Sequence, residues 1–430
     1  MKRLLPAFLA FSMISQFLIG EAFAATSVKA GSSCTKLNST VISSGFKFQC
    51  VKSGKKLVWK SIGVVKTNPT PSPSPSPSAS PTATLSATPT ASKSSDPEVL
   101  QYKNLLTFQE LLNRRADIPS IAFTATQDLL QFNQKKELPA QPFTFRIAPG
   151  LTVDTSKYQD AIKKANQFFA NFLRPISFLG ILYSAKDMDW AKTVFDSETG
   201  FADHDMMVKA PFGGDPNSTG GGANANVIEN HGITVYGYYK GFDTDLLVTS
   251  MSMTTHEYVH QIQTAQFSPK LGDQGTQSNE TMPCWITEGQ ANFNGIGIAT
   301  NSLDEYLKVR DFQAHSLILR NATNYNGNPE ITKSELTPDY ISKYYDQMNI
   351  TKGSSCIRST QYGLGYSLGM LTVEALSAIK GPDSTMILVQ KLGTGKTFEQ
   401  SFQEVYGEKW SDVKGILAQL VSVELQTILT

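Results

Sequence analysis

A run of alternating prolines divides this chain of 430 residues into two parts that must fold separately. From Thr67 to about Asp96 the sequence consists almost entirely of Pro, Ser, Thr and Ala. Each proline fixes φ and removes a backbone N–H donor, so the segment is expected to be an extended, semi-rigid spacer. We therefore predict a linker over residues 67–96, a small unit over 25–66 before it and a large unit over 97–430 after it.

Residues 1–24 have the layout of a secretory signal peptide. Lys2 and Arg3 precede an apolar run from Leu4 to Ile19, and the segment Ala22 to Ala24 provides an A-x-A cleavage site. A membrane anchor is the alternative, but polar residues interrupt the run, which is shorter than the ~20 residues that a span needs. No later segment is apolar enough to cross a bilayer. We expect an exported protein that is secreted or held at the cell surface, without a membrane span once the signal is removed.

Export makes the four cysteines informative. In an oxidising compartment they can form two disulfides, with three connectivities. Cys34 and Cys50 are the locally sensible pair inside the small unit, which leaves Cys284 with Cys356. A cysteine nucleophile has little support, because no histidine lies near in sequence and the compartment favours oxidation.

The small unit, residues 25–66, alternates apolar and polar residues around Ser53-Gly54, which predicts a β-hairpin. At about forty residues it needs its disulfide to be stable. It resembles short Cys-pair modules at the ends of secreted bacterial proteins, and this resemblance implies a role in attachment. A charge run is more often a solvated face, but contact with an anionic cell wall stays open for its lysines, Lys52, Lys55, Lys56 and Lys60.

The large unit has the composition of a globular domain, and the net charge of the whole chain is only +1, so nothing indicates a nucleic-acid partner. Phe143–Ile147 and Phe178–Tyr183 are predicted strands. Between them, apolar residues recur at helical spacing, at Tyr158, Ile162, Ala165, Phe169 and Phe172. Ser218–Asn226 is glycine-rich and predicted to be a flexible surface loop, because it lacks the Gly-Lys-Ser/Thr ending of a phosphate loop. The sequence leaves open whether residues 97–142 are propeptide-like or part of the fold.

Two of the five histidines lie four residues apart with a glutamate between them, as His256, Glu257 and His260. Residues four apart lie on the same face of a helix, so both imidazoles can bind one metal ion while Glu257 lies about 100° around the helix, beside it. This HExxH pattern is the signature of zinc hydrolases; two ordinary surface histidines are the alternative. The helix is expected from about Ser250 to Ala265, with an apolar face made of Met251, Tyr258, Val259 and Ile262.

Zinc in a hydrolase takes three protein ligands and leaves a position for water, so a third His, Glu or Asp must come from elsewhere in the chain. Glu288 follows His260 by 28 residues, in a stretch predicted to be a helix that starts near Pro283 and buries Trp285. The pattern resembles the peptidase MA-like gluzincins, in which a glutamate on a second helix completes a His, His, Glu site. The metzincin alternative needs a glycine and a third histidine soon after His260, and residues 261–266 supply neither.

The gluzincin resemblance implies an α+β, zincin-like catalytic domain with a mixed-sheet lobe, a mainly helical C-terminal lobe and a cleft between them. It implies Zn²⁺ held by His256, His260 and Glu288, with Glu257 as general base in the hydrolysis of a peptide or protein substrate. By the same resemblance, the predicted strand Ile233–Tyr238 is expected at the edge of the sheet, where it can hold an extended peptide.

The resemblance extends to residues around the expected site. Asn292 lies four residues after Glu288, where some gluzincins have an aspartate that orients a ligand histidine, and its carbonyl can accept the same hydrogen bond without adding charge. The segment from residue 361 to 371 resembles a Tyr-x-x-Gly helix of the family, which makes Tyr362 the first and Tyr366 the second candidate for stabilising the oxyanion. Packing aromatics are an equally good interpretation of both.

The C-terminal part begins with Thr397 and Gln400 in a capping-box pattern, continues to Gly407 as a stop signal and ends in a helix predicted over about 411–428. These resemble the closing helices of the same family, so the likeness extends from about Phe143 to the C-terminus. It is strongest at the two metal-binding stretches. The remaining histidines are expected to be structural or exposed: His204, His231 and His315.

The sequence thus favours a secreted zinc metallopeptidase, and two other functions stay open. One is a zinc hydrolase of non-protein amides such as cell-wall crosslinks, which the sequence does not separate from a peptidase. The other is a catalytically inactive cell-surface binding protein whose function resides in residues 25–66. Glu257 argues against the second alternative, because a structural zinc site does not need it.

Overall fold

The computed structural model describes residues 33–37, 39–43, 46–53, 56–64, 100–200, 205–267, 274–322, 333–348 and 364–428. The described residues divide into two compact units, one before residue 99 and one from residue 99 onward. The signal peptide and linker expected over residues 1–24 and 67–96 lie outside the described residues. Among the described helices, none is both long enough and apolar enough to cross a membrane.

The small unit is a three-stranded antiparallel sheet in the order β1-β2-β3, with β1 at Thr40–Ser43, β2 at Phe46–Ser53 and β3 at Lys56–Val64. The predicted hairpin is formed by β2 and β3, whose register pairs Cys50 with Trp59. The predicted disulfide between Cys34 and Cys50 is confirmed. It fixes the segment before β1 to the central strand, in a unit too small to depend on its core alone.

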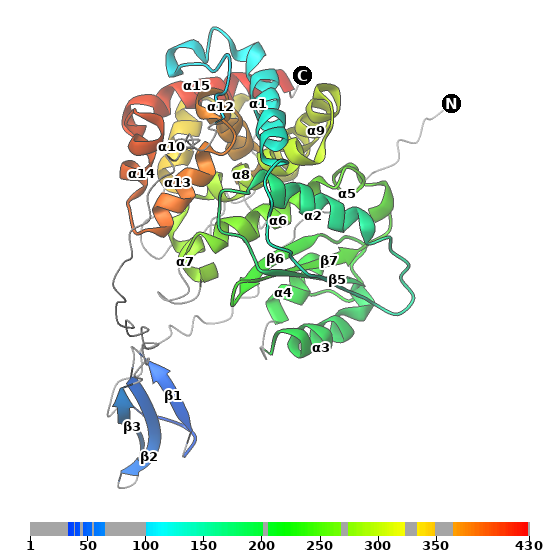
Figure 1. Ribbon diagram of the computed structural model, residues 1–430, viewed down its shortest axis with the longest axis vertical. Helices are drawn as coiled ribbons and strands as arrows, with labels where there is room; N and C mark the ends of the chain where they lie inside the picture. The colour runs from blue at the N-terminus through cyan, green and yellow to red at the C-terminus, as the bar shows by residue number, and fades with distance from the viewer. Residues whose placement is uncertain are drawn as a thin grey trace, which may run out of the picture. The chain divides into compact units, whose positions relative to one another are not determined.

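The large unit contains a mixed four-stranded sheet in the order β4-β5-β7-β6 (Figure 1). Strands β4 (Phe143–Ile147), β5 (Ser177–Ser184) and β7 (His231–Tyr238) are parallel, and β6 (Ala223–Ile228) joins β7 antiparallel. The predicted strand–helix–strand run is confirmed, because α2 (Ser156–Phe168) connects β4 to β5.

The sheet is covered on both faces, as the alternation of side chains along β5 requires. Phe178 and Leu182 point into the larger core, which includes residues of α2 and α6 (Ser252–Ala265). Leu179 and Ile181 point into a second core with α3 (Met188–Thr199) and α4 (Asp205–Lys209). Figure 1 shows these two pairs of helices on opposite sides of the sheet.

Two expectations about the sheet are wrong. Ile233–Tyr238 belongs to β7, which lies between β5 and β6, and the edge beside it is β6. Residues 223–226, expected in a flexible loop, are the first residues of β6. The glycines contribute to the pairing, since a Cβ at Gly221 would lie 2.3 Å from the carbonyl oxygen of Gly237.

The rest of the unit is helical. Trp285 stacks on Trp410 in its core, with ring centroids 5.2 Å apart, as expected for a buried residue at the start of the second helix. The helices are α1 (Ile118–Asn133), α5 (Leu246–Thr249), α7 (Gln274–Thr281), α8 (Cys284–Ala299), α9 (Leu303–Ala322), α10 (Pro338–Met348), α12 (Met370–Lys380), α13 (Ser384–Gly393), α14 (Phe398–Tyr406) and α15 (Trp410–Ile428). The predicted capping box of Thr397 and the stop at Gly407 are both confirmed at the ends of α14.

Residues 100–142 are packed as part of the fold. Leu106 donates its backbone N–H to the carbonyl of Ala378, and Phe108 packs on Phe402. The hydroxyl of Tyr102 donates to Asp383 at 2.9 Å. Burial raises the pKa of the Asp383 carboxyl, although the bond from Tyr102 acts in the opposite direction. The segment therefore contributes core residues that the helical layer needs.

Asp383→Asn is expected to stabilise the protein at neutral pH relative to wild type. The amide still accepts from Tyr102, but the cost of ionising a buried carboxyl disappears. Because the pKa is raised on folding, the unfolded wild-type chain releases this proton first. Wild-type stability therefore falls as pH rises from about 3.9 to the raised pKa, and stays lower above it. Urea unfolding at pH 4 and pH 7 measures this, and a stability difference that shrinks as pH rises would contradict it.

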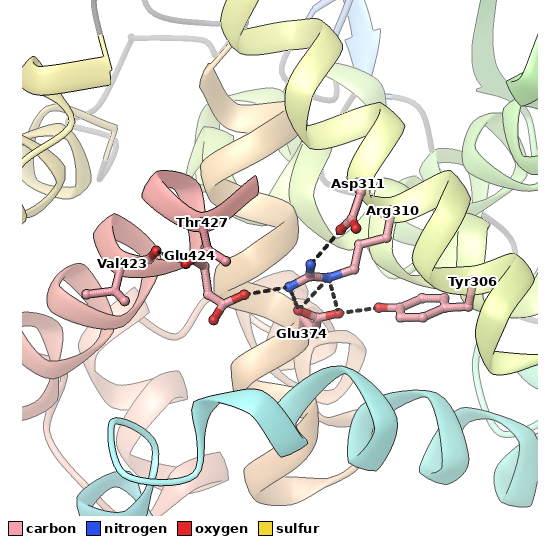
Figure 2. A network of polar contacts seen from close by, with 7 residues as sticks. All are labelled: Tyr306, Arg310, Asp311, Glu374, Val423, Glu424 and Thr427. Carbon is pink, nitrogen blue, oxygen red and sulfur yellow. Dashed lines mark hydrogen bonds and ion pairs between the residues drawn. The ribbon is translucent and has the colours of Figure 1, made fainter. Parts of the chain in front are cut away.

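A buried ionic network ties three helices of this layer together (Figure 2). Arg310 on α9 donates through Nη2 to Glu374 Oε2 on α12 at 2.7 Å and to Glu424 on α15 at 3.2 Å. Tyr306 donates to the other oxygen of Glu374 at 2.5 Å, and Asp311 accepts from Nη1 of Arg310 at 2.8 Å. Arg310 and Glu374 are both buried, and Arg310 supplies the positive charge that the buried Glu374 carboxylate needs.

Arg310→Met is predicted to lower the free energy of unfolding by about 3–5 kcal/mol, because it leaves Glu374 buried without its cation. Lys391→Met is the control, since it breaks an exposed pair with Glu404, for which about 1 kcal/mol or less is expected. Urea unfolding at pH 7 compares the two. Equal losses would mean that the network is no more important than a surface pair.

Candidate metal centre

The predicted motif lies on α6, a helix that is buried on nearly all sides. The expected apolar residues Tyr258, Val259 and Ile262 are fully buried, and so are polar neighbours such as Thr255. Helix α6 lies between the sheet and α8, which explains why both of its sides are covered. The helix begins after Met251, which adopts φ 62° and so ends the preceding turn rather than extending the helix.

His256, His260 and Glu288 meet at one point. The Nε2 atoms of His256 and His260 lie 3.0 Å apart. Oε2 of Glu288 lies 3.6 Å from Nε2 of His256 and 3.4 Å from Nε2 of His260. An ion bound tetrahedrally at 2.0–2.1 Å holds its ligand atoms about 3.3 Å apart. The three donors therefore have the spacing that such an ion requires. They form the one potential metal-binding group of His, Cys, Asp and Glu found among the described residues.

Glu288 reaches the histidines because α8 packs unusually close to α6. Thr255 Oγ1 on α6 donates to the carbonyl of Gly295 on α8 at 2.6 Å. A Cβ at Gly295 would lie 2.9 Å from the backbone nitrogen of His256. Glu288 is seven residues before Gly295, two turns along the same face of α8, so the same contact that needs a glycine directs the carboxylate at the imidazoles.

The three groups of the site shift one another's pKa values, most clearly Glu288 and His260. Burial acts to lower the pKa of His260, but the charge and hydrogen bonding of Glu288 outweigh it and raise this pKa to about 9. Burial likewise acts to raise the pKa of Glu288, yet the charge of His260 and hydrogen bonds from both imidazoles bring it well below its ordinary value. The pKa of His256 is lowered, chiefly by burial. The carboxylate of Glu288 thus stabilises a positive charge on His260.

Glu257 stays apart from this group. It is buried, and burial raises the pKa of its carboxyl to about 7. The nearby His260 acts to lower this pKa and the charge of Glu288 acts to raise it further. A carboxyl with a pKa near neutrality can exchange a proton at physiological pH, which is the property that a general base needs. Solvent can reach the site, since the side chain of His260 is 19% exposed.

Asn292 lies beside His256 and is held from two sides. Its Nδ2 donates to the carbonyl of Tyr366 at 2.9 Å, and its Oδ1 accepts from Gln313 at 3.3 Å. Asn292 acts to raise the pKa of His256, but Nδ1 of that imidazole makes no hydrogen bond to any described residue. Asn292 is thus next to His256, but the predicted hydrogen bond from this imidazole to the Asn292 carbonyl is not formed in the structure.

Tyr366 lies against the site, with its ring stacked on that of His256 at 5.8 Å and 13° between planes. It belongs to a π-helical turn, Gly365–Gly369, and such turns occur frequently at functional sites. The turn packs on α8 with no room for side chains, since a Cβ at Gly289 would lie 2.1 Å from the carbonyl carbon of Gly369. Tyr362, the first candidate, lies outside the described residues.

Two residues near the site were missed by the sequence analysis. Gln263 lies 2.9 Å from Nδ1 of His260, and its position three residues further on the helix was a signal that could have found it. Tyr344 has a buried hydroxyl with no hydrogen-bond partner among the described residues, 3.3 Å from where a Cβ of Gly365 would be. Burial raises its pKa well above 10, and the charge of Glu288 contributes. Nothing in the spacing of α10 separates Tyr344 from a packing aromatic.

The remaining histidines and cysteines discussed from the sequence lie away from this centre or outside the described residues. His231 contacts Ser177 Oγ through Nδ1 at 2.6 Å at the exposed start of β7, and His315 is exposed. Cys284 at the start of α8 is disulfide-bonded. Its expected partner, Cys356, lies outside the described residues, as does His204.

Comparison with protein families, curated proteins and solved structures found no match to this chain.

Gly295→Ala is predicted to weaken both the fold and metal binding. The added methyl must push α8 away from α6, which costs about 1–3 kcal/mol of stability in a close-packed interior and moves Glu288 from the histidines. The control is Gly415→Ala on α15. An added Cβ there would have no atom of another part of the described chain within 4 Å, so a gain in stability of about 0.5–1 kcal/mol is expected. Urea unfolding and zinc titration measure the two effects. Wild-type stability and wild-type zinc affinity in Gly295→Ala would show that the close contact between α6 and α8 is not needed for either property.

Proposed function

We propose that this chain is a zinc-dependent metallopeptidase with a zincin-like fold of the gluzincin type. The observation that carries the proposal is the convergence of two imidazole nitrogens and one carboxylate oxygen, with a second buried carboxyl, that of Glu257, on the same helix turn. A purely structural metal site has no use for Glu257. The mixed sheet that supports α6 and the helical layer that supports α8 agree with the two lobes of this fold.

Zinc is the metal that the donor set favours, because imidazole nitrogen and carboxylate oxygen at tetrahedral spacing suit it. When bound, Zn²⁺ lowers the pKa of a water molecule and polarises a carbonyl oxygen. His256, His260 and Glu288 would hold it, leaving a position for water. The partly exposed side of His260 is the access route from solvent.

The chain's own groups supply the proton transfers. Glu257 accepts a proton from the attacking water and donates it to the leaving amine, and its buried, weakly acidic carboxyl suits both steps. Tyr366, stacked on His256, is the described candidate for a hydroxyl donor to the developing negative charge. Tyr362 remains the other candidate for this role.

The edge strand β6 is suited to hold an extended peptide. Gly237 N–H donates to the carbonyl of Gly222, so alternate residues from Gly222 onward bond to β7. Ala223 and Ala225 therefore direct their backbone groups away from β7. Strand β6 also packs beside α6, so a peptide added at this edge would lie along the helix that carries the motif.

Localisation and attachment are part of the same proposal. A signal peptide over residues 1–24, two disulfides and a proline-rich linker suit a protein exported to the cell surface or medium. The small unit, with its disulfide and the sheet formed by β1, β2 and β3, would bind the cell wall, and the linker would connect it to the catalytic unit. A cell-wall amide is the alternative substrate, because the same chemistry cleaves both kinds of amide.

The test is cleavage of a mixed quenched-peptide library by the zinc-loaded protein. Glu257→Gln is expected to lose about 10²–10⁴ in turnover while zinc stays bound, because only the proton transfer is removed. Glu288→Ala and chelator treatment are expected to abolish turnover by loss of the metal. Undiminished turnover by metal-loaded Glu257→Gln would refute its assignment as the base.

Substrate class is decided by a parallel assay. If the library is not cleaved although zinc binds stoichiometrically, crosslinked cell-wall fragments are offered under the same conditions. Cleavage of those fragments alone would replace the peptidase proposal by a cell-wall amidase. Zinc binding without either activity would favour a binding protein.

A further inference from the structure

A chain of neutral hydrogen bonds runs from His260 into the helical core. Oε1 of Gln263 lies 2.9 Å from Nδ1 of His260. Nε2 of Gln263 donates to the backbone carbonyl of Thr287 at 3.0 Å and to Oε1 of Gln290 at 2.9 Å. Nε2 of Gln290 in turn donates to Thr385 Oγ1 at 2.8 Å. The chain thus connects α6, α8 and α13.

The chemistry of these partners fixes the orientation of the Gln263 amide. The Thr287 carbonyl can only accept, so the group of Gln263 that faces it must be the NH₂. Gln263 therefore directs its oxygen at His260, and an acceptor at that point requires Nδ1 to carry a proton. The other ring nitrogen, Nε2, is then the one available to a cation beside His256 and Glu288.

Burial removes the alternatives to this arrangement. Gln263, Gln290 and Thr385 are all buried, so water cannot take over their hydrogen bonds. A flipped amide would place two acceptors against each other at Thr287 and a donor against the protonated Nδ1 of His260. The network therefore holds the imidazole in one orientation as well as one protonation pattern.

We propose that Gln263, held by Thr287 and Gln290, is a positioning residue that keeps Nδ1 of His260 protonated and turns Nε2 toward a shared metal ion. The inference rests on the proposed metal-dependent function, but the hydrogen bond belongs to the chain itself and can be tested without the metal. Such a partner is commonly a carboxylate or a backbone carbonyl. Here an amide supplies the acceptor without adding a charge to the site.

The first readout is the Nδ1–H signal of His260 in ¹H–¹⁵N NMR spectra of the metal-free protein. Gln263→Met removes the acceptor at similar side-chain length, so this proton is expected to exchange with solvent about tenfold faster or more. Gln263→Glu restores an acceptor and is expected to restore the signal. Gln261→Met is the matched control, because Gln261 is a buried glutamine on the same helix whose amide donates to Thr234 and does not accept from a histidine.

The second readout is zinc affinity, measured by competition with a chelator. Gln263→Met is expected to bind zinc about 10–100-fold more weakly, Gln263→Glu to recover most of that loss and Gln261→Met to match wild type. Gln290→Met leaves Gln263 hydrogen-bonded to the carbonyl of Thr287, so this variant is expected to lose less zinc affinity than Gln263→Met. If Gln263→Met fails to fold, as judged by circular dichroism, Gln290→Met carries the test.

Two outcomes separate this proposal from the proposed function. An unchanged His260 signal and wild-type zinc affinity in Gln263→Met would overturn the positioning role, whatever the enzyme does. A wild-type protein that binds no zinc would overturn the metal-dependent function, while the exchange rate of the His260 proton still decides whether Gln263 positions the ring. Loss of zinc affinity in Gln261→Met equal to that in Gln263→Met would also reject the proposal, because it would reduce the effect to general destabilisation.

Discussion

The close contact between α6 and α8 at Gly295 is the constraint on which the rest of the candidate site depends. The two imidazoles come from one helix and could converge on their own, but Glu288 comes from another and reaches them only at this separation. Every larger residue at 295 would meet the backbone of His256. The opposite side of α8 is equally closed, because Gly289 and Gly369 leave no space between α8 and the π-helical turn. Helix α8 is therefore held from both sides, and its carboxylate has little freedom to move.

The helical layer contains two kinds of buried polar contact, ion pairs and hydrogen-bonded amides. Between α9, α12 and α15, Arg310, Glu374 and Glu424 bury full charges that join the three helices. Next to the motif, Gln263, Gln290 and Asn292 supply amides instead. Charges near the donors would compete with the ligands for the cation or repel it, whereas an amide fixes direction without changing the charge. The buried ion pairs therefore stabilise the helical layer, and the amides add no charge beside the histidines, Glu257 and Glu288.

Much of the site could be predicted because its information is local. The spacing of His256, Glu257 and His260 within one helix needs only helical periodicity, and the helix around Glu288 carries its own apolar pattern. The disulfide between Cys34 and Cys50 followed from short sequence separation. The edge strand was assigned wrongly for a physical reason. Strand β7 is covered on both faces, and its alternating residues look the same whether or not another strand lies beside it. Only the pairing with β6, which the glycines hid in an apparent loop, distinguishes an interior strand from an edge.

The orientation of the Gln263 amide could not be predicted from the sequence either. Its distance of three residues from His260 is visible in the sequence and would place the two side chains on one face of a helix. Spacing alone does not say whether the amide offers its oxygen or its nitrogen to the imidazole, and only the oxygen can accept a hydrogen bond from Nδ1–H of His260. That choice is made by the carbonyl of Thr287 and by Gln290, which tertiary packing brings from α8. The proposed role of Gln263 thus depends on the same helix contact that brings Glu288 to the histidines, so the position of the Glu288 carboxylate and the orientation of the His260 ring are set together.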